Sequence, residues 1–246
     1  MKRDCVELSA RLKRIADMVS AGNAVCDVGC DHGFVSIYLV QQQIATKVYA
    51  MDVRKGPLDR AKEHIEEYGL ADKIETRLSD GVEKLSVGEA DAMVLAGMGG
   101  KLMQKILSEG RGKCLAMKEL VLGPQSEVAQ FRCFLREEGY RIVEEDMILE
   151  DGKFYPILKV IPPDAECMAE EIQARTKEEQ ELFDEFGSHL LRSRNPVLLK
   201  YLDFMQGLHE EVLQKLTEAA GDGAKQRALQ IKQELHKISQ ARQYFK

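Results

Sequence analysis

The residues with the clearest chemical potential lie in the stretch Asp27-Val28-Gly29-Cys30-Asp31-His32-Gly33. It follows the short apolar run 24–26 and precedes the apolar-rich segment 34–40, which is the pattern of a strand, a tight glycine turn and a helix. Glycine lets the backbone approach a ligand closely, and the amino end of a helix offers free N–H groups. The stretch therefore predicts a site for a nucleotide-like ligand.

Three further sites follow at the spacing expected for such a ligand. Val48-Tyr49-Ala50-Met51-Asp52 is an apolar run that ends in an acid about 20 residues past the glycine turn. Leu78-Ser79-Asp80-Gly81 ends a third run, and Ala96-Gly97-Met98-Gly99-Gly100 ends a fourth. An acid at Asp52 can accept hydrogen bonds from ribose hydroxyls, and one at Asp80 from an adenine amino group. Because ligands of open α/β sheets bind outside the carboxyl ends of the strands, all four sites should face one crevice.

Alternating strand and helix signals place these sites on a sheet. An amphipathic helix is expected over 7–19, strands at 24–28, 47–52, 73–78, 91–96 and 118–122, and helices at about 33–42, 57–68, 99–109 and 126–138. Such alternation predicts a parallel sheet with helices on both faces. Residues 140–149 and 154–161 are expected to form two more strands around the turn Glu150-Asp151-Gly152. This α/β arrangement, a Rossmann-like parallel sheet ending in an antiparallel hairpin, resembles that of class I methyltransferases.

Ile161-Pro162-Pro163-Asp164 marks an expected boundary between two domains, 1–161 and 164–246. The second is predicted to be helical. One acidic helix spans 166–186, another begins at Asn195-Pro196, and a third follows Gly221-Asp222-Gly223. Because apolar residues recur in the last two at near-heptad spacing, we expect an antiparallel helical hairpin of coiled-coil type.

Charge is distributed unevenly. The whole chain has a net charge of −6, which argues against binding nucleic acid over its entire surface. Residues 164–185 carry nine acids and two bases, whereas residues 186–246 carry ten bases and six acids. The basic hairpin could contact RNA phosphates, or its charges could merely solubilise a coiled coil. The same two interpretations apply to Arg11, Lys13 and Arg14, which lie off the apolar stripe of the first helix.

Composition narrows the class of protein. No apolar run approaches the ~18 residues of a membrane span, and the amino-terminal residues lead into a polar helix rather than a signal sequence. The six cysteines are scattered, and Cys26 and Cys30 are not at zinc-site spacing. We therefore expect a cytoplasmic protein with no metal and no membrane association, whose thiols are free.

The leading acid and the glycines at 29 and 33 resemble the first motif of S-adenosylmethionine (SAM) methyltransferases, D/E-x-G-x-G-x-G, with Asp31 in place of the middle glycine. Six further stretches accompany this motif: Leu8-Ser9-Ala10-Arg11-Leu12, residues 51–58, 77–81, 96–100 and 123–127, and Glu150-Asp151-Gly152-Lys153-Phe154-Tyr155-Pro156. Taken together, they resemble the bacterial tRNA adenine-22 N1-methyltransferases. The resemblance covers roughly residues 5–160, and the helical appendage fits it too.

This resemblance implies SAM as the methyl donor and the D-arm region of tRNA as the target. By motif, the cofactor-binding residues would be Asp27, Gly29, Cys30, Asp31, Gly33, Asp52, Val53, Asp80, Gly81, Ala96 and Gly97. Asp31, His32 and Met98 would lie on the side of the target base, where a catalytic contribution is expected. The tRNA would contact Arg11, Arg14, Gly99, Lys101 and Gln125.

Methyl transfer from a sulfonium depends on alignment more than on acid–base catalysis. N1 of adenine has a free lone pair, whereas an exocyclic amine would want an Asn-Pro-Pro-Tyr type motif after the fourth strand. Ala-Gly-Met-Gly-Gly stands there instead, which favours a ring nitrogen. Some alternatives stay open: Met98 as a core residue, His32 as a hydrogen-bonded turn residue, a methyltransferase acting on a small molecule or protein, and a non-catalytic SAM-binding module.

Overall fold

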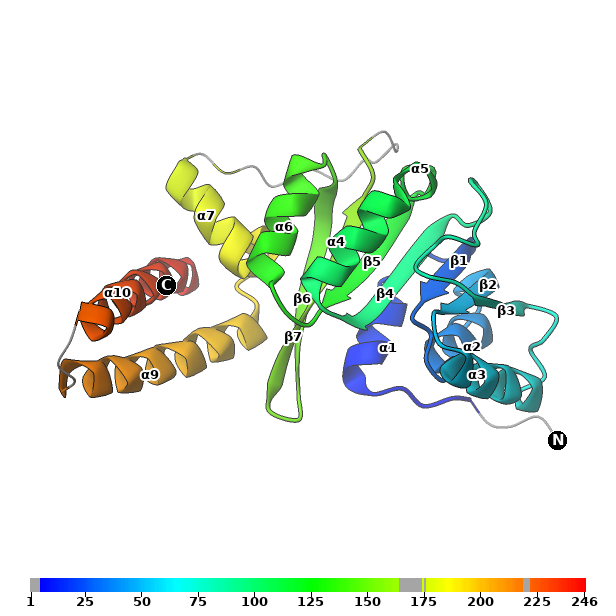
Figure 1. Ribbon diagram of the computed structural model, residues 1–246, viewed down its shortest axis with the longest axis horizontal. Coiled ribbons are helices and arrows are strands. Elements are labelled where there is room, and N and C mark those ends of the chain that lie inside the picture. Colours follow the sequence, from blue (N-terminus) through cyan, green and yellow to red (C-terminus); the bar gives the residue numbers. More distant parts are fainter. Residues whose placement is uncertain (1–4, 164–173, 175, 219–221) are drawn as a thin grey trace. The chain divides into compact units, whose positions relative to one another are not determined.

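The computed structural model describes residues 5–163, 174, 176–218 and 222–246, and the chain divides into two compact units, Met1–Glu171 and Ile172–Lys246 (Figure 1). The expected linker from Asp164 and the first part of the helix predicted over 166–186 lie outside the described residues. Each unit is considered by itself below.

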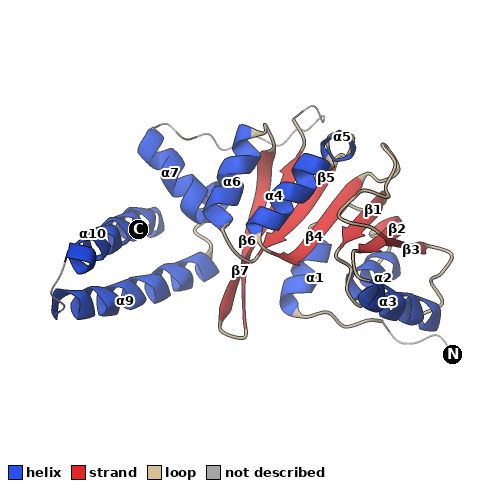
Figure 2. Cartoon of the chain, viewed as in Figure 1, coloured by secondary structure: helices blue, strands red, loops and turns tan. Residues whose placement is uncertain are grey.

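The first unit is built on a seven-stranded sheet with the strand order β3-β2-β1-β4-β5-β7-β6 (Figure 2). Strands β1 to β5 are parallel, and β7 is antiparallel to both β5 and β6. The predicted α/β class, a parallel sheet that ends in an antiparallel hairpin, is confirmed. The strands are β1 Asn23–Val28, β2 Ala45–Asp52, β3 Ile74–Leu78, β4 Ala92–Met98, β5 Glu119–Pro124, β6 Arg141–Glu150 and β7 Lys153–Ile161.

Helices cover both faces of this sheet, because successive residues of the central strands point to opposite sides. Val25 belongs to the apolar cluster on one face, which includes side chains of α1, α2 and α3. Cys26 and Val28 belong to the cluster on the other face, which includes side chains of α4, α5 and α6. Burial on both faces explains the nearly continuous apolar runs of the sequence. The helices are α1 Ala10–Asp17, α2 Phe34–Gln41, α3 Lys55–Glu67, α4 Gly100–Glu109, α5 Arg111–Cys114 and α6 Val128–Glu137.

Helix α1 begins later than the predicted residue 7 and is held by the β6–β7 hairpin. Ser9 caps it by accepting a hydrogen bond from the Leu12 N–H, so the helix starts at Ala10. Arg14 donates from Nε to Asp146 Oδ2 at 2.6 Å and from Nη2 to Glu144 Oε1 at 2.7 Å. These charge-assisted bonds fasten the helix to β6.

The second unit consists of helices α7 Lys177–Phe186, α8 Ser188–Arg192, α9 Pro196–Glu218 and α10 Asp222–Arg242, with a final 3₁₀ turn at Gln243–Phe245. Asn195 caps α9 as predicted: its Oδ1 accepts hydrogen bonds from the N–H groups of Val197 and Leu198 at 2.9 and 3.1 Å. Among the described residues, no helix of the chain is long and apolar enough to cross a membrane.

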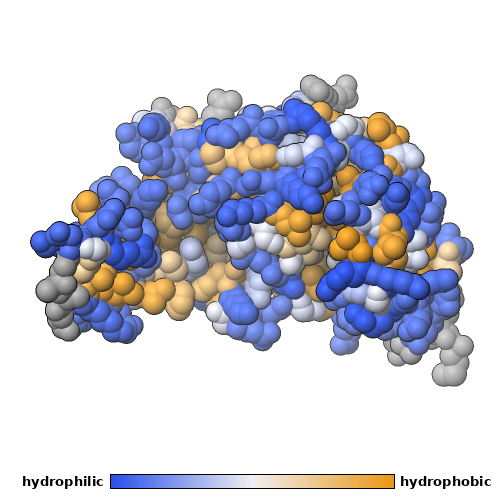
Figure 3. Space-filling model, in the orientation of Figure 1, coloured by the Kyte–Doolittle hydropathy of each residue, from blue (hydrophilic) through white to orange (hydrophobic). Residues whose placement is uncertain are grey.

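Helices α9 and α10 pack against each other in opposite directions. Asp203 on α9 pairs with Arg242 at the end of α10, and His209, further along α9, pairs with the earlier residue Glu234 at 3.2 Å. This order of partners is that of an antiparallel hairpin. Apolar side chains gather along α9 on the surface shown in Figure 3. Among the large apolar residues of α9, Phe204 and Leu208 are exposed.

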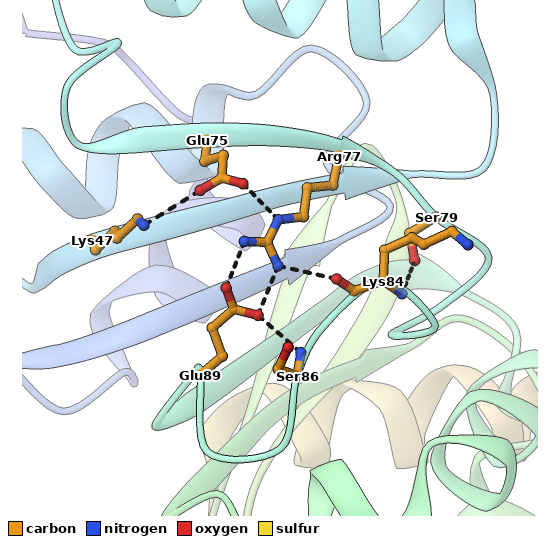
Figure 4. Close-up of polar contacts among 7 residues, drawn as sticks. All are labelled: Lys47, Glu75, Arg77, Ser79, Lys84, Ser86 and Glu89. Carbon is orange, nitrogen blue, oxygen red and sulfur yellow. Dashed lines mark hydrogen bonds and ion pairs between the residues drawn. The ribbon is translucent and has the colours of Figure 1, made fainter.

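An ion-pair network fastens the outer strand β3 to the loop that follows it (Figure 4). Arg77 donates from Nη2 and Nη1 to the two carboxylate oxygens of Glu89, at 2.6 and 2.8 Å, and from Nε to Glu75 at 2.8 Å. Hydrogen bonds from Arg77, and then from the Ser86 N–H, lower the pKa of Glu89 to about 2. Because Asp80 lies in the bridged loop, the network also helps to set its position.

Replacing Arg77 with Gln should lower the free energy of unfolding of the first unit by about 1–3 kcal/mol at pH 7, since a bidentate charge-assisted pair is lost. The pKa of Glu89 is depressed in the folded state, so the stabilisation is present above pH 4.5 and declines as the pH falls toward 2. The difference between wild type and variant should shrink accordingly. Urea denaturation followed by circular dichroism at pH 7 and pH 3 measures it.

The matched control is Lys84→Gln, which removes an exposed ion pair with Glu83 and should leave the unfolding midpoint unchanged. Equal midpoints for Arg77→Gln and Lys84→Gln would show that the network does not stabilise the unit.

Candidate active site

A cavity of about 540 Å³ lies at the carboxyl ends of β1, β2 and β4, beside α1 and the amino ends of α2 and α4. Parallel strands bring their carboxyl ends to the same edge, so sites far apart in sequence meet there. The predicted site residues that line the cavity are Arg11, Asp27, Gly29, Cys30, Asp31, His32, Asp52, Val53, Asp80, Gly81, Ala96, Gly97, Met98 and Gln125.

The glycine turn after β1 forms the floor of this cavity. Gly29 and Asp31 have φ angles of 77° and 47°, and the N–H groups of Gly29 and Cys30 both donate to the Met51 carbonyl. Aspartate is among the few residues other than glycine that adopt this left-handed conformation readily, which explains how Asp31 replaces a glycine. A Cβ atom at position 29 would collide with the Met98 side-chain methyl group. Position 29 therefore needs glycine for both its conformation and its contact.

Met98 combines two environments that the sequence left as alternatives. Its side chain lines the cavity over Gly29 and also packs against the buried cluster of α4 and α6. It is thus a partly buried residue that packs against the core and presents part of its surface to the cavity.

Asp52 ties two loops together at the end of β2. Its carboxylate accepts hydrogen bonds from the N–H groups of Arg54, at 2.8 Å, and Asp31, at 3.4 Å, and the residue is only 4% exposed. A carboxylate has further lone pairs, so it can still accept from ligand hydroxyls. Asp80 is more open and lies 3.7 Å from the Lys105 ammonium.

Asp27 is the most buried acid of the site, with 2% of its surface exposed. The Ser36 hydroxyl donates to its Oδ2 at 2.7 Å. Burial raises the pKa of Asp27 to about 6, and the hydrogen bond from Ser36 offsets part of that rise. The carboxylate is therefore short of solvation and would be stabilised by a nearby positive charge.

His32 lines the cavity from the turn and belongs to a cluster of three rings. Its ring is 5.9 Å from that of Phe34 and 5.8 Å from that of His64, and the Phe34 and His64 rings are 4.7 Å apart. Nδ1 of His64 is hydrogen-bonded to the His32 carbonyl at 2.9 Å. His32 is thus both a fixed turn residue and a cavity wall.

The electrostatics of the cavity restrict its ligand. Four carboxylates, those of Asp27, Asp31, Asp52 and Asp80, line it alongside Arg11 and Arg54. A pyrophosphate would be repelled by this set, whereas hydroxyl groups and positive charge would be favoured. SAM, with its ribose hydroxyls, ammonium and sulfonium, fits these residues.

Four predicted site residues lie outside the cavity lining: Arg14, Gly33, Gly99 and Lys101. Arg14 is engaged by β6, and Gly33 permits close packing, because a Cβ there would lie 3.1 Å from that of Ala61. Gly99 precedes α4, and Lys101, in the first turn of α4, is 82% exposed in its side chain.

Sequence reasoning missed the apolar part of the wall. Phe34 opens α2 and Leu102 lies in the first turn of α4, so their position at the start of a helix that follows a strand was the available signal. Ile106 lies one turn further along α4. The full set of cavity residues that were not predicted is Leu12, Val28, Phe34, Val35, Arg54, Leu102 and Ile106.

In the part of the chain that the structure describes, no group of three or more His, Cys, Asp or Glu side chains could hold a metal ion.

The Cys30 thiol lines the cavity, and burial raises its pKa well above its usual value, with the nearby carboxylates adding to the rise. This thiol stays protonated at neutral pH and is a wall of the cavity rather than a nucleophile.

Comparison with known proteins identifies the family. A family described as "Methyltransferase domain" matches residues 8–158. The tRNA (adenine(22)-N(1))-methyltransferase of Bacillus subtilis (strain 168) is 32% identical over 213 residues, which are 85% of this chain and 87% of the relative. The chain belongs to the tRNA (adenine-22-N1)-methyltransferase family. The resemblance found in the sequence is thereby confirmed.

Solved structures of the family share the fold over nearly the whole chain. The crystal structure of the tRNA methyltransferase TrmK of B. subtilis has a TM-score of 0.80 at 27% identity, covering 96% of this chain and 98% of that one. TrmK of M. capricolum, in complex with the cofactor product S-adenosylhomocysteine (SAH), has a TM-score of 0.79 at 25% identity, covering 97% and 99%.

The raised pKa of Asp27 predicts a pH dependence of stability in the ligand-free protein. Between about pH 3.8, its ordinary value, and about pH 6 the folded state binds the proton more tightly than the unfolded state. The wild type should therefore lose stability relative to Asp27→Asn as the pH rises from 4 to 6, by about 1–3 kcal/mol in total, and the difference should be constant above pH 7.

Urea denaturation of both proteins from pH 4 to pH 8 tests this. Because the Asn side chain can still accept the Ser36 hydrogen bond, the variant isolates the charge. A difference that does not change with pH would mean that Asp27 titrates normally despite its burial.

Proposed function

We propose that this protein transfers the methyl group of SAM to N1 of adenine 22 in tRNA. The observation that carries the proposal is the cavity itself: in a chain of this family, Asp52 and Asp80 lie at one end of it and Asp27 beside the glycine turn. A relative that covers most of the chain is a tRNA (adenine(22)-N(1))-methyltransferase by name, and a structural neighbour binds SAH in the same fold.

The proposed cofactor contacts follow from the cavity. Asp52 and Val53 hold the ribose, and Asp80 and Gly81 hold the adenine of SAM. Asp27 faces the positively charged methionine side together with Gly29 and Cys30, and Ala96 and Gly97 form the opposite wall. Gly33 acts indirectly, by allowing α2 to pack on α3. When bound, SAM supplies an activated methyl group, so the residues have only to bind and align it.

The target base is proposed to enter beside His32 and Met98. N1 of adenine attacks with its own lone pair and becomes positively charged, so no base has to remove a proton first. The Asp31 carboxylate, 59% exposed at the cavity wall and 3.7 Å from His32 Nε2, is suited to stabilise that charge as it develops.

The tRNA is proposed to cover the mouth of the cavity through Gly99, Lys101 and Gln125, with further phosphate contacts from the helical unit. We also assign the protein to the cytoplasm, where tRNA is available and free thiols such as that of the exposed Cys5 stay reduced.

The proposed activity predicts that the protein, incubated with labelled SAM and an unmodified bacterial tRNA transcript, forms 1-methyladenosine at nucleotide 22. Digestion to nucleosides and mass spectrometry identify the product.

Asp52→Ala should weaken SAM binding by about 1–3 kcal/mol, because charge-assisted hydrogen bonds to the cofactor are lost, and calorimetry measures this change.

A transcript with guanine at nucleotide 22 is the matched substrate control and should remain unlabelled. Label in that transcript, or a different methylated nucleoside, would contradict the assignment. SAM binding without any tRNA methylation would favour a small-molecule or protein substrate instead.

The helical unit offers a separate prediction. Lys225 on α10 has an 80% exposed side chain, and Lys232 lies exposed two turns later. If they contact phosphates, Lys225→Gln combined with Lys232→Gln should weaken tRNA binding and reduce the slope of log affinity against log salt by up to about 2. Filter binding from 50 to 300 mM salt measures it.

Lys118→Gln is the control, because this exposed lysine precedes β5 at the opposite edge of the sheet from the cavity. An unchanged slope in the double variant would assign the two charges to solubility alone. The KM for SAM should be the same in all three proteins.

A further inference from the structure

Arg11 has an unusual environment for a residue expected to touch RNA. It lies in the cavity lining, and its side chain is only 17% exposed. Two of its guanidinium nitrogens, Nε and Nη1, are buried and have no hydrogen-bond partner among the described residues. Leaving a buried charged donor unpaired is costly, so such an atom calls for a ligand.

One motif of the sequence that had no assigned role, the stretch 150–156, holds Arg11 in this position through two of its residues. The Glu150 carboxylate, at the end of β6, accepts the Arg11 backbone N–H at 3.1 Å and lies 3.8 Å from Nε. The Tyr155 ring, on β7, lies 4.8 Å from the guanidinium carbon. The carboxylate and the ring orient the guanidinium without occupying Nη1.

The unpaired Nη1 points to the β4 side of the cavity. It lies 4.0 Å from the position that a Cβ atom of residue 97 would take, and the side-chain amide of Gln125 lies 3.7 Å from the same position. Because residue 97 is glycine, this space is open, and two hydrogen-bonding side chains converge on it.

Charge is therefore ordered along the cavity. Asp52 ends β2 and Asp80 follows β3, where hydrogen-bond donors of a ligand would be accepted. Arg54 lies beside them, but its side chain is exposed and lies 3.8 Å from Asp52. Arg11 lies beyond β1, at β4 and β5, where an anion would be accepted. A single ligand that suits both ends has hydroxyl and amino groups at one end and a negative charge at the other.

We propose that Arg11 binds the α-carboxylate of the methionine part of SAM, with Gln125 as a second donor. This inference rests on the proposed function for the identity of the cofactor, and it moves both Arg11 and Gln125 from the tRNA surface to the cofactor site. A phosphodiester at the protein surface would not reach buried nitrogens at the cavity wall, and Arg14, one turn further along α1, is already engaged by β6.

The test uses two ligands that share the thioadenosine part and differ in the amino-acid part that carries the carboxylate. SAH carries the amino-acid carboxylate, and 5′-methylthioadenosine lacks the whole amino-acid part. Arg11→Gln in the full-length protein should lower SAH affinity by about 10- to 100-fold and leave methylthioadenosine affinity within twofold, because only the charge-assisted contact is lost. Calorimetry measures both, and Arg11→Lys should bind SAH between wild type and Arg11→Gln.

Lys13→Gln, which removes an exposed cation from the same helix, is the matched control and should bind both ligands as the wild type does. Equal losses for SAH and methylthioadenosine in Arg11→Gln would overturn the inference and assign Arg11 to the shape of the cavity. Unchanged SAH affinity with weakened tRNA binding would also overturn it, in favour of a phosphate contact. Failure of the proposed function is a different result, since wild-type protein would then bind SAH but not methylate tRNA.

Discussion

The parallel pairing of β1 with β2 and β4 is the constraint on which the rest of this structure depends. The register aligns Asp27 with Ala50 on one side and Val94 on the other, so the carboxyl ends of the three strands lie side by side, with β4 continuing beyond Leu95 to Met98. Parallel strands need crossover helices, and those helices must start where the strands stop. The loops that carry the cavity residues therefore all lie at the edge formed by the carboxyl ends of the strands. The cavity forms at that edge because the strands are parallel.

An element outside that parallel set holds the α1 wall of the cavity in place. Three acids of β6 in the antiparallel β6–β7 hairpin contact α1. Glu150 accepts a hydrogen bond from the Arg11 backbone N–H, and Glu144 and Asp146 accept hydrogen bonds from the Arg14 side chain. Arg14 is engaged by ion pairs with Glu144 and Asp146. Arg11 keeps two guanidinium nitrogens, Nε and Nη1, that have no hydrogen-bond partner among the described residues. The same hairpin therefore separates a purely structural arginine from one that is available to a ligand, although both lie in a single eight-residue helix.

Much of this organisation could be predicted from the sequence, because strand and helix periods, glycine turns and strand-end acids are local signals. Asp27, Asp52 and Asp80 were found in this way. The roles of Arg11 and Arg14 could not be separated, since their difference lies in partners more than 100 positions away. Phe34, Leu102 and Ile106 were missed because an apolar residue in the first turns of a helix looks the same whether it faces a core or a cavity. The assignment of tRNA-contacting residues stays a prediction.

The bonds between α1 and β6 join residues 130 to 139 positions apart, which has a consequence for how the protein is made. A ribosome completes the glycine turn and the first four strands long before β6 emerges. Until then the arginines of α1 have no counterpart, and contacts of such long sequence separation are slow to form. The α1 wall of the cavity is consequently fastened only after nearly the whole first unit has been synthesised.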